Sequence, residues 1–390
     1  MDAINQLFER LRRRPDIEAP NLYAVDAADR LILDEAQAAL TDAASGAVTV
    51  IGDHYGALTL GAIAGFGASE IRVHQDPVTG ERALDLNARE VLTGDVLAAS
   101  APPWRSMALS PELVDGARVV LMQIPRSLSE LTEIAELIAA HADPEVQVFA
   151  GGRDKHMTRA MNDVLAQSFG RVQASLGRQK ARVLLASGPQ TPAGSLGGPS
   201  FPVTEHLAEI DLTVVAHGAV FAGPSLDIGT RFLLENFPQP RPEERTAVDL
   251  GCGTGILAAT LARRFPQLKV IATDQSAAAV ASAAATAEAN GVGERVRVLR
   301  DDALSTLADD SVDLIVCNPP FHVGAAVHTG AALRMFDAAG RVLRPGGRLW
   351  TVYNSHLGYR PALTRLVGPT RQVARNAKFT VTESIVDGHD

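Results

Sequence analysis

The stretch TAVDLGCGTGILAATLARRFP, residues 246–266, decides the fold. Residues 246–250 are mostly apolar and short, which is typical of a buried strand. Three closely spaced glycines follow in a tight loop, and residues 256–265 have the composition of a helix that Pro266 ends. A glycine loop lets the backbone approach a ligand, and the N–H groups that open a helix favour an anionic group. The stretch therefore predicts part of an α/β fold with a nucleotide-type binding loop.

Acidic positions at the ends of the next two predicted strands complete this candidate ligand site. Asp274 closes the strand LKVIATD, where a carboxylate can bind both hydroxyls of an adenosine ribose, in NAD and S-adenosylmethionine alike. The dinucleotide fingerprint would need a glycine at position 256, which is Ile256 here, so a dehydrogenase is disfavoured. A third strand ends at the same sheet edge and can present an adenine contact. The predicted cofactor-binding residues are Asp249, Gly251, Cys252, Gly253, Gly255, Asp274, Gln275, Asp302, Ala303 and Asn318.

Length and composition limit the class of protein. With 390 residues the chain exceeds the size at which one hydrophobic core stops growing, so two domains are expected. A hydrophobic fraction of 46% and two cysteines exclude a disordered chain and a disulfide scaffold. The sequence has no apolar run long enough to span a membrane and no secretory signal, so we expect a cytoplasmic protein. Two cysteines without clustered histidines predict no metal site.

The stretch SGPQTPAGSLGGPSFPVT, residues 187–204, predicts a linker between two α/β domains, 1–186 and 205–390. The two halves align at an offset of about 198 residues, which places Asp76 over Asp274. The first half lacks the third glycine and has Gln-Ile-Pro where the second has Asn-Pro-Pro. We therefore interpret residues 1–186 as a degenerate duplicate that has lost its cofactor site.

The motifs of the second half resemble the class I S-adenosylmethionine-dependent methyltransferases. DLGCGTG (249–255) is similar to their first motif, Asp274 to their ribose-binding position, and RVLRPGGRLW (341–350) to the turn before their fifth strand. This resemblance implies S-adenosylmethionine as cofactor and two tandem Rossmann-like folds. Each fold would have a seven-stranded, mostly parallel sheet. The run 372–384 predicts the antiparallel last hairpin, with a turn at 376–378.

The tetrad Asn318-Pro319-Pro320-Phe321 follows the predicted buried strand VDLIVC. An amino group conjugated to a base is a poor nucleophile because its lone pair is drawn into the ring. The Asn318 side-chain oxygen and the Pro319 carbonyl can accept its N–H bonds and pull it toward a reactive geometry, while Phe321 offers a stacking face. We expect the tetrad to be catalytic and Phe321 and His322 to bind substrate.

A narrower resemblance is to the bacterial ribosomal RNA guanine-N2 methyltransferases, two-domain enzymes with a degenerate first half. It rests on the tetrad with His322, on residues 219–234, on 353–359 and on 375–379. It implies methyl transfer to a guanine N2 amine, with ribosomal RNA or a ribosomal subunit particle as partner. It also implies cofactor contacts from Asp227, Gly229 and Thr230 and substrate contacts from Arg375 and Lys378.

Other readings stay open at the level of sequence. Adenine-N6 and glutamine-amide acceptors are also planar amines, so the tetrad does not choose among them. A non-catalytic RNA-binding or assembly factor would keep the fold without the motifs. Net charge is −9, yet residues 338–382 contain eight basic residues and no acidic one, which predicts a local anion-facing surface. A second basic cluster, assigned to RNA placement, comprises Arg153, Lys155, Arg159, Arg171, Arg178, Lys180 and Arg182.

Overall fold

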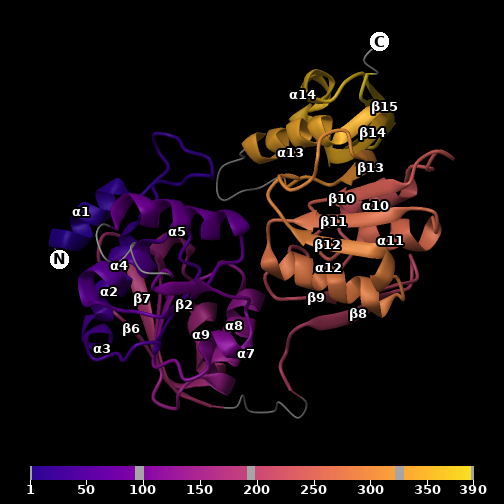
Figure 1. Ribbon diagram of the computed structural model, residues 1–390. Coiled ribbons are helices and arrows are strands. Elements are labelled where there is room, and N and C mark those ends of the chain that lie inside the picture. The colour runs from indigo at the N-terminus through magenta and orange to yellow at the C-terminus, as the bar shows by residue number, and fades with distance from the viewer. Residues whose placement is uncertain (1, 93–100, 191–197, 321–328, 388–390) are drawn as a thin grey trace. The chain divides into compact units, whose positions relative to one another are not determined.

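The computed structural model describes residues 2–92, 101–190, 198–320 and 329–387. The chain divides into two compact units, Met1–Phe201 and Pro202–Asp390, here the amino-terminal and carboxyl-terminal units. Figure 1 shows that each is a sheet with helices packed against it. None of the described helices is long and apolar enough to cross a membrane.

The amino-terminal unit is built on a seven-stranded sheet of order β3-β2-β1-β4-β5-β7-β6. Its first five strands are parallel, and β7 runs antiparallel to both of its neighbours. The strands are β1 (Val48–Ile51), β2 (Ile71–His74), β3 (Trp104–Ser106), β4 (Val119–Gln123), β5 (Gln147–Arg153), β6 (Phe169–Ala174) and β7 (Ala181–Pro189).

Helices connect the parallel strands of this unit, as a parallel sheet requires. Short apolar strands alternate with longer amphipathic segments, which is the pattern that the sequence predicts. The helices are α1 (Asp2–Arg10), α2 (Ala27–Glu35), α3 (Gln37–Thr41), α4 (Ala57–Phe66), α5 (Val78–Val91), α7 (Pro111–Val114), α8 (Leu128–His141), the 3-10 turn η1 (Asp154–His156) and α9 (Arg159–Ser168).

The carboxyl-terminal unit repeats the arrangement, with the order β12-β11-β10-β13-β14-β16-β15. The last two strands form the expected antiparallel hairpin, and β16 pairs with both β14 and β15. A separate two-stranded ribbon, β8 with β9, precedes this sheet. The strands are β8 (Val203–Leu207), β9 (Leu212–Ala216), β10 (Thr246–Leu250), β11 (Lys269–Asp274), β12 (Val296–Arg300), β13 (Val312–Cys317), β14 (Leu343–Asn354), β15 (Thr370–Arg375) and β16 (Phe379–Ile385).

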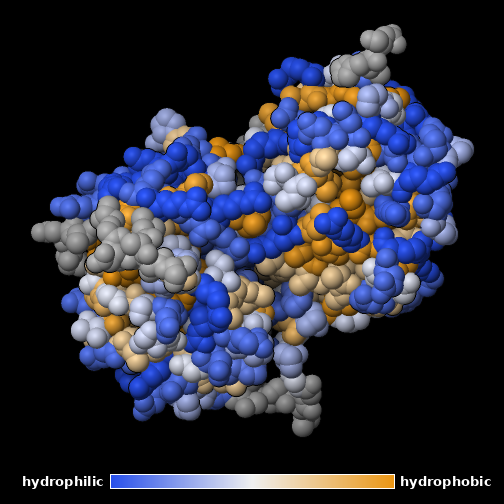
Figure 2. Space-filling view, in the orientation of Figure 1, coloured by the Kyte–Doolittle hydropathy of each residue, from blue (hydrophilic) through white to orange (hydrophobic). Residues whose placement is uncertain are grey.

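The helices of this unit cover both faces of its sheet. Alanine is the best helix former, and α12 is mostly alanine, with Ala281 and Ala284 among its exposed positions. Figure 2 shows that apolar and polar residues are mixed on the visible surface. The helices are α10 (Ile228–Glu235), α11 (Ile256–Arg264), α12 (Ala277–Ala289), η2 (Gly293–Arg295), α13 (Thr329–Val342), η3 (Ser355–Leu357) and α14 (Arg360–Leu366).

Central strand β10 shows why the sheet is buried on both faces. Ala247 packs into one apolar cluster, whereas Val248 and Leu250 pack into the cluster on the opposite face. Side chains alternate between faces along a strand, so a strand that buries apolar side chains on both faces of the sheet needs helices on both sides. This burial fixes the register of the strands, and with it the position of the residues that follow each carboxyl end.

The shared strand order confirms the predicted tandem fold and corrects one detail of the alignment. The amide of Gly52 donates to the His74 carbonyl at 2.9 Å, and the amide of Gly251 donates to the Thr273 carbonyl at 2.8 Å. The structural offset at this edge is therefore 199 rather than 198. Gln75, not Asp76, is the counterpart of Asp274, because sequence matching alone does not fix the register of a loop.

The glycine- and proline-rich stretch between the units is shorter than its composition predicts. Strand β7 continues to Pro189, and β8 begins at Val203, so strands take up both ends of residues 187–204. Ser187 pairs with Gln147 in the sheet, which shows that backbone pairing overrides a composition typical of a linker.

Candidate active site

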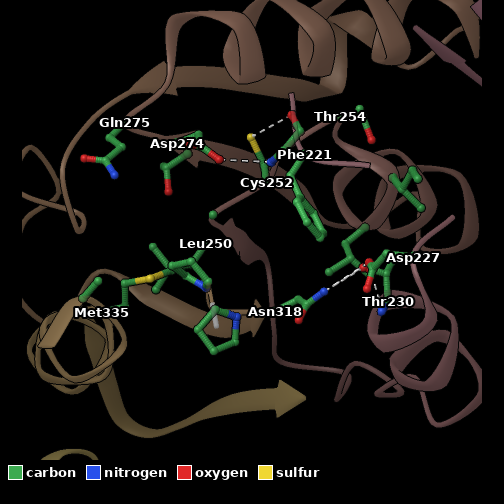
Figure 3. Close-up of a pocket in the computed structure, with 18 of the residues that line it drawn as sticks. Phe221, Asp227, Thr230, Leu250, Cys252, Thr254, Asp274, Gln275, Asn318 and Met335 are labelled. Carbon is green, nitrogen blue, oxygen red and sulfur yellow. Dashed lines mark hydrogen bonds between the residues drawn. The ribbon is translucent and has the colours of Figure 1, made fainter. Parts of the chain in front are cut away.

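A pocket of about 350 Å³ lies at the carboxyl ends of the parallel strands of the carboxyl-terminal unit (Figure 3). Ligands bind at this edge in open α/β sheets, and the volume is within the range of small-molecule sites. Twelve of the predicted site residues line the pocket: Asp227, Thr230, Gly251, Cys252, Gly253, Asp274, Gln275, Asp302, Ala303, Asn318, Pro319 and Pro320.

The glycine loop between β10 and α11 forms one wall of the pocket. Gly253 has φ +51°, and a Cβ there would meet nothing within 4 Å, so its backbone borders open space. Gly255 has a different reason to be glycine: with φ +77°, its Cβ would lie 2.8 Å from Ala283 Cα on α12. Gly255 does not line the pocket, and its role is to let α11 and α12 pack closely.

Asp274 is held at the end of β11 by two backbone donors. Its Oδ2 accepts from the Gly253 amide at 3.1 Å, and its Oδ1 accepts from the Ser276 amide at 3.0 Å. These bonds tie the glycine loop to the second strand and fix the carboxylate beside the pocket. The arrangement leaves acceptor capacity on a fixed carboxylate, which is what two ribose hydroxyls need.

The adjacent aspartates after β12 have different environments. Asp301 also lines the pocket, and it accepts from the Ser305 hydroxyl and from the Thr306 amide at 2.9 Å, so it stabilises the turn. Asp302 lies on the pocket side, with its Oδ2 3.4 Å from an Arg334 guanidinium nitrogen. Ala303 follows with φ +49°. The local turn thus places Asp302 and Ala303 at the pocket, as the sequence predicts.

Asn318, directly after β13, is oriented by two acceptors. Its Nδ2 donates to Asp227 Oδ2 at 3.2 Å and to Thr230 Oγ1 at 3.0 Å (Figure 3). A carboxylate only accepts hydrogen bonds, so the amide nitrogen must face Asp227 and the amide oxygen must face away. Asn318 Oδ1 is buried and has no hydrogen-bond partner among the described residues. It is an acceptor preorganised for a donor that the protein itself does not supply.

Asp227 owes its position to α10. Its carboxylate caps this helix by accepting from the Gly229 amide at 2.8 Å and the Thr230 amide at 3.2 Å. A Cβ at Gly229 would lie 3.1 Å from Asp227 Oδ1 and 3.4 Å from Asn318 Nδ2. Gly229 therefore supports the amide pair and does not line the pocket.

Asp249 lies beneath the pocket and is fully buried. Its Oδ2 accepts from the Ala258 amide at 2.9 Å, in the first turn of α11. Burial raises the pKa of Asp249 to about 7. Asp249 thus holds the glycine loop against its helix and does not face the pocket.

The remaining predicted contacts lie elsewhere or outside the described residues. Asn376 Oδ1 accepts from the Lys378 amide at 2.8 Å and closes the predicted turn between β15 and β16. Arg375 and Lys378 are exposed at the same sheet edge as the end of β14, but they do not line the pocket. Phe321 and His322 lie outside the described residues.

Half of the eight basic residues in the stretch 338–382 are paired with acidic residues, which the sequence expectation did not include. Arg348 is buried and pairs with Glu244 at 2.7 Å and with Glu383 at 3.3 Å. Arg341, Arg344 and Arg371 also pair with acidic residues from outside the stretch. These acidic partners, Glu244, Asp309, Asp313 and Glu383, lie outside the stretch, so composition within it does not reveal them.

Several pocket residues carry no clear signal in the sequence. Phe221 precedes α10 and lies within residues 219–234, which point to the site only through a family resemblance. Arg334 and Met335 come from α13. Arg334 and Met335 belong to none of the motifs found in the sequence. They reach the pocket through the packing of α13.

These residues together fit S-adenosylmethionine. The pocket offers a fixed carboxylate at the second strand, an open glycine backbone at a helix start and a buried amide oxygen without a protein partner. These groups suit a ribose, an α-carboxylate and an N–H donor respectively. Among the described residues, no cluster of side chains could hold a metal ion.

Similarity to known proteins covers both units. Residues 3–190 match the family model described as RLMG N-terminal domain, and residues 211–383 match Methyltransferase small domain. The solved structure of a T. thermophilus 16S rRNA N2 methyltransferase, in complex with AdoMet and guanosine, has a similar fold. Its TM-score is 0.73 at 20% identity, over 97% of this chain and 99% of that one.

Curated relatives are similar along almost the whole chain. A protein of Shewanella amazonensis named Ribosomal RNA large subunit methyltransferase G is 33% identical over 378 residues, which are 96% of this chain and 95% of that protein. Proteins of the same name from Pseudomonas paraeruginosa and Streptomyces avermitilis are 36% and 34% identical, each over 96% of both chains. The chain therefore belongs to the family of the ribosomal RNA large subunit methyltransferases G.

Proposed function

We propose that the protein transfers a methyl group from S-adenosylmethionine to the exocyclic N2 amine of a guanine in large-subunit ribosomal RNA. The observation that carries the proposal is the buried, unpartnered Asn318 Oδ1 at the pocket. The names of the full-length relatives supply the class of RNA. The reaction would take place in the cytoplasm, on the RNA or on a ribosomal subunit particle.

Asn318 and the Pro319 carbonyl would act on the acceptor amine. Two hydrogen-bond acceptors favour a tetrahedral nitrogen over a planar one and support the positive charge that develops there. Asp227 and Thr230 are positioning residues, because they hold the amide nitrogen and thereby direct the amide oxygen. When bound, S-adenosylmethionine supplies an electrophilic methyl group, and correct placement accounts for most of the rate.

Cofactor binding is assigned to the glycine loop and the strand ends. Asp274 would accept from the ribose hydroxyls, while Asp302 and Ala303 would contact the adenine. The first N–H groups of α11 would bind the anionic end of the cofactor. Asp249 and Gly255 would contribute indirectly, through the loop and through the packing of α11.

The test is methyl transfer from labelled S-adenosylmethionine to large-subunit RNA from cells that lack the modification, followed by nucleoside analysis. We expect labelled N2-methylguanosine with wild type and far slower labelling with Asn318→Ala. Label in N6-methyladenosine or in a protein glutamine would reassign the acceptor, and no transfer to any fraction would contradict the proposal.

The amino-terminal unit is proposed to place the RNA, and the carboxyl-terminal unit is proposed to be the catalytic domain. The cluster from Arg153 to Arg182 supports this role, although two of its members are neutralised: Arg178 pairs with Asp34, and Arg182 lies 3.7 Å from Asp154. Lys155, Arg159 and Lys180 are exposed and form no ion pair with a described residue.

Removing charge at Arg153, Lys155 and Arg159 tests this placement. Each lost phosphate contact should lower the salt slope of RNA binding by about one unit, because fewer counterions are released. The affinity for S-adenosylmethionine should stay unchanged. An unaltered salt slope would leave the amino-terminal unit with a structural role.

A further inference from the structure

Phe221 is an exposed aromatic residue at the pocket. Its side chain is 85% exposed, the highest value for any large apolar pocket residue among those described. The next two residues, Ala222 and Gly223, have φ of +64° and +56°. A left-handed alanine is unfavourable, so the chain accepts local strain where it presents this ring.

The ring occupies a defined place in the pocket. Figure 3 shows it between the glycine loop that carries Cys252 and the Asn318–Asp227 pair. The loop side is where the helix start can bind an anionic group, and the Asn318 side is where the acceptor amine would be held. The reacting centre of the methyl donor must lie between these two points. The ring therefore borders the position of the sulfonium.

The carboxylates that line the pocket are each held in place by donors from the protein. Asp227 accepts from two helix amides and from Asn318, and Asp274 accepts from two loop amides. Asp301 binds Ser305 and Thr306, and Asp302 pairs with a guanidinium. The face of the Phe221 ring adds an apolar, electron-rich surface to this lining, beside the Asn318 Oδ1 acceptor.

We propose that the face of Phe221 binds the positively charged sulfonium of S-adenosylmethionine, and so distinguishes the methyl donor from its neutral thioether product. A cation over an aromatic face is attracted by the ring quadrupole, and a neutral sulfur is not. After transfer the attraction is lost, which favours release of the product. The inference rests on the proposed function, because it requires S-adenosylmethionine in this pocket.

The experiment compares two ligands on the full-length protein without RNA. Calorimetry gives Kd for S-adenosylmethionine and for S-adenosylhomocysteine with wild type, Phe221→Leu and Phe221→Trp. Leucine keeps apolar bulk but has no ring, so the Kd for S-adenosylmethionine should rise roughly 3- to 30-fold, while the Kd for S-adenosylhomocysteine should change less than about twofold. Tryptophan should keep the preference for the cationic ligand.

Ile228→Ala is the matched control. Ile228 is 58% exposed near the start of α10 but does not line the pocket, so its truncation should leave both affinities unchanged. Equal losses for the two ligands in Phe221→Leu would show apolar packing alone and overturn the inference. Unchanged affinities for both ligands would also overturn the inference. If only the KM for RNA then rises, the ring stacks on the base instead. Failure of wild type to bind either ligand would instead contradict the proposed function.

Discussion

The two units hold an amide in the same way, although the cofactor loop resembles a methyltransferase loop in the second unit alone. In the amino-terminal unit, Asp26 caps α2, and Gln123 at the end of β4 donates to Asp29 at 2.5 Å. In the carboxyl-terminal unit, Asn318 at the end of β13 donates to the N-cap and to the third residue of α10. Both pairs join the end of the fourth sheet strand to a helix start.

The units differ in what covers the loop after β1 and the corresponding loop after β10. Tyr55 stands in the amino-terminal loop, and its hydroxyl donates to Asp16 at 2.7 Å while the Arg13 guanidinium lies 4.6 Å from its ring centre. Asn87 also donates to the Tyr55 carbonyl at 2.8 Å. The segment around residue 16 thus covers the loop that stays open in the other unit. The lesson is that a few side chains decide whether the loop on this shared scaffold is covered or open.

The largest expected difference between the units concerns the side-chain amides of Asn318 and Gln123. Asn318→Ala should lower turnover by roughly 10²–10³-fold with little change in the Kd for S-adenosylmethionine, because it removes a preorganised contact made in the transition state. Gln123→Ala, in the equivalent position, should leave turnover near wild type. Steady-state kinetics and calorimetry on both variants make the test. Equal losses of affinity and turnover in Asn318→Ala would indicate a structural role.

Cofactor stoichiometry tests the same difference through Asp274. Calorimetry should give about one S-adenosylmethionine per chain, because Gln75 replaces the ribose carboxylate in the amino-terminal unit. Asp274→Ala should weaken binding roughly 10- to 150-fold, as expected for losing a charge-assisted acceptor. Gln75→Ala should not alter affinity in folded protein. Two equivalent sites would contradict the degenerate duplicate.

The two helix caps provide a matched pair with a smaller effect. Asp227→Ala and Asp26→Ala should each destabilise the protein by about 0.5–2 kcal/mol, because each removes an N-cap carboxylate. Asp227→Ala should also lower turnover by roughly tenfold, since the Asn318 amide is then held by Thr230 alone. Thermal unfolding and kinetics separate these effects. A similar loss of turnover in both variants would remove the positioning role of Asp227.

What the sequence predicts well is local. The glycine loop and Asp274 lie within thirty residues, and their chemistry follows from the ends of two adjacent strands. The hairpin turn at 376–378 is local too, and the structure has it as expected. Two strong signals at short range therefore sufficed for the fold and for those predicted residues at the glycine loop and strand ends that line the pocket.

What the sequence leaves out depends on distant packing. The orientation of Asn318 is set by Asp227, ninety-one positions earlier, and no spacing rule connects the two. Arg348 lies in the stretch 338–382, which contains no acidic residue, and Glu244, 104 positions away, neutralises it. Phe221 becomes a pocket residue only when the segment before α10 is folded against the sheet edge.

The last comparison is of two buried carboxylates that hold the helix after the first strand. Asp249, in β10, accepts from the Ala258 amide, and burial raises its pKa to about 7. Asp53, in the loop after β1, accepts from the Leu58 and Thr59 amides, and burial raises its pKa to about 6. Between pH 3.8 and its folded pKa, each of these carboxyls is therefore protonated in the folded protein but ionised in the unfolded chain, where its pKa is 3.8.

The contribution of each carboxyl to stability should therefore fall as pH rises, over a pH range that differs between Asp249 and Asp53. Between about pH 4 and the folded pKa, the folded state binds more protons than the unfolded state, so the free energy of unfolding decreases and then levels off. Asn keeps the oxygen acceptor but does not titrate. The Tm difference between wild type and Asp249→Asn should shift by roughly 5 °C from pH 5 to pH 8, with the change ending near pH 7. The corresponding difference for Asp53→Asn should be smaller and end near pH 6, because its folded pKa is lower. A Tm difference that is independent of pH in both variants would show that neither carboxyl carries the extra proton.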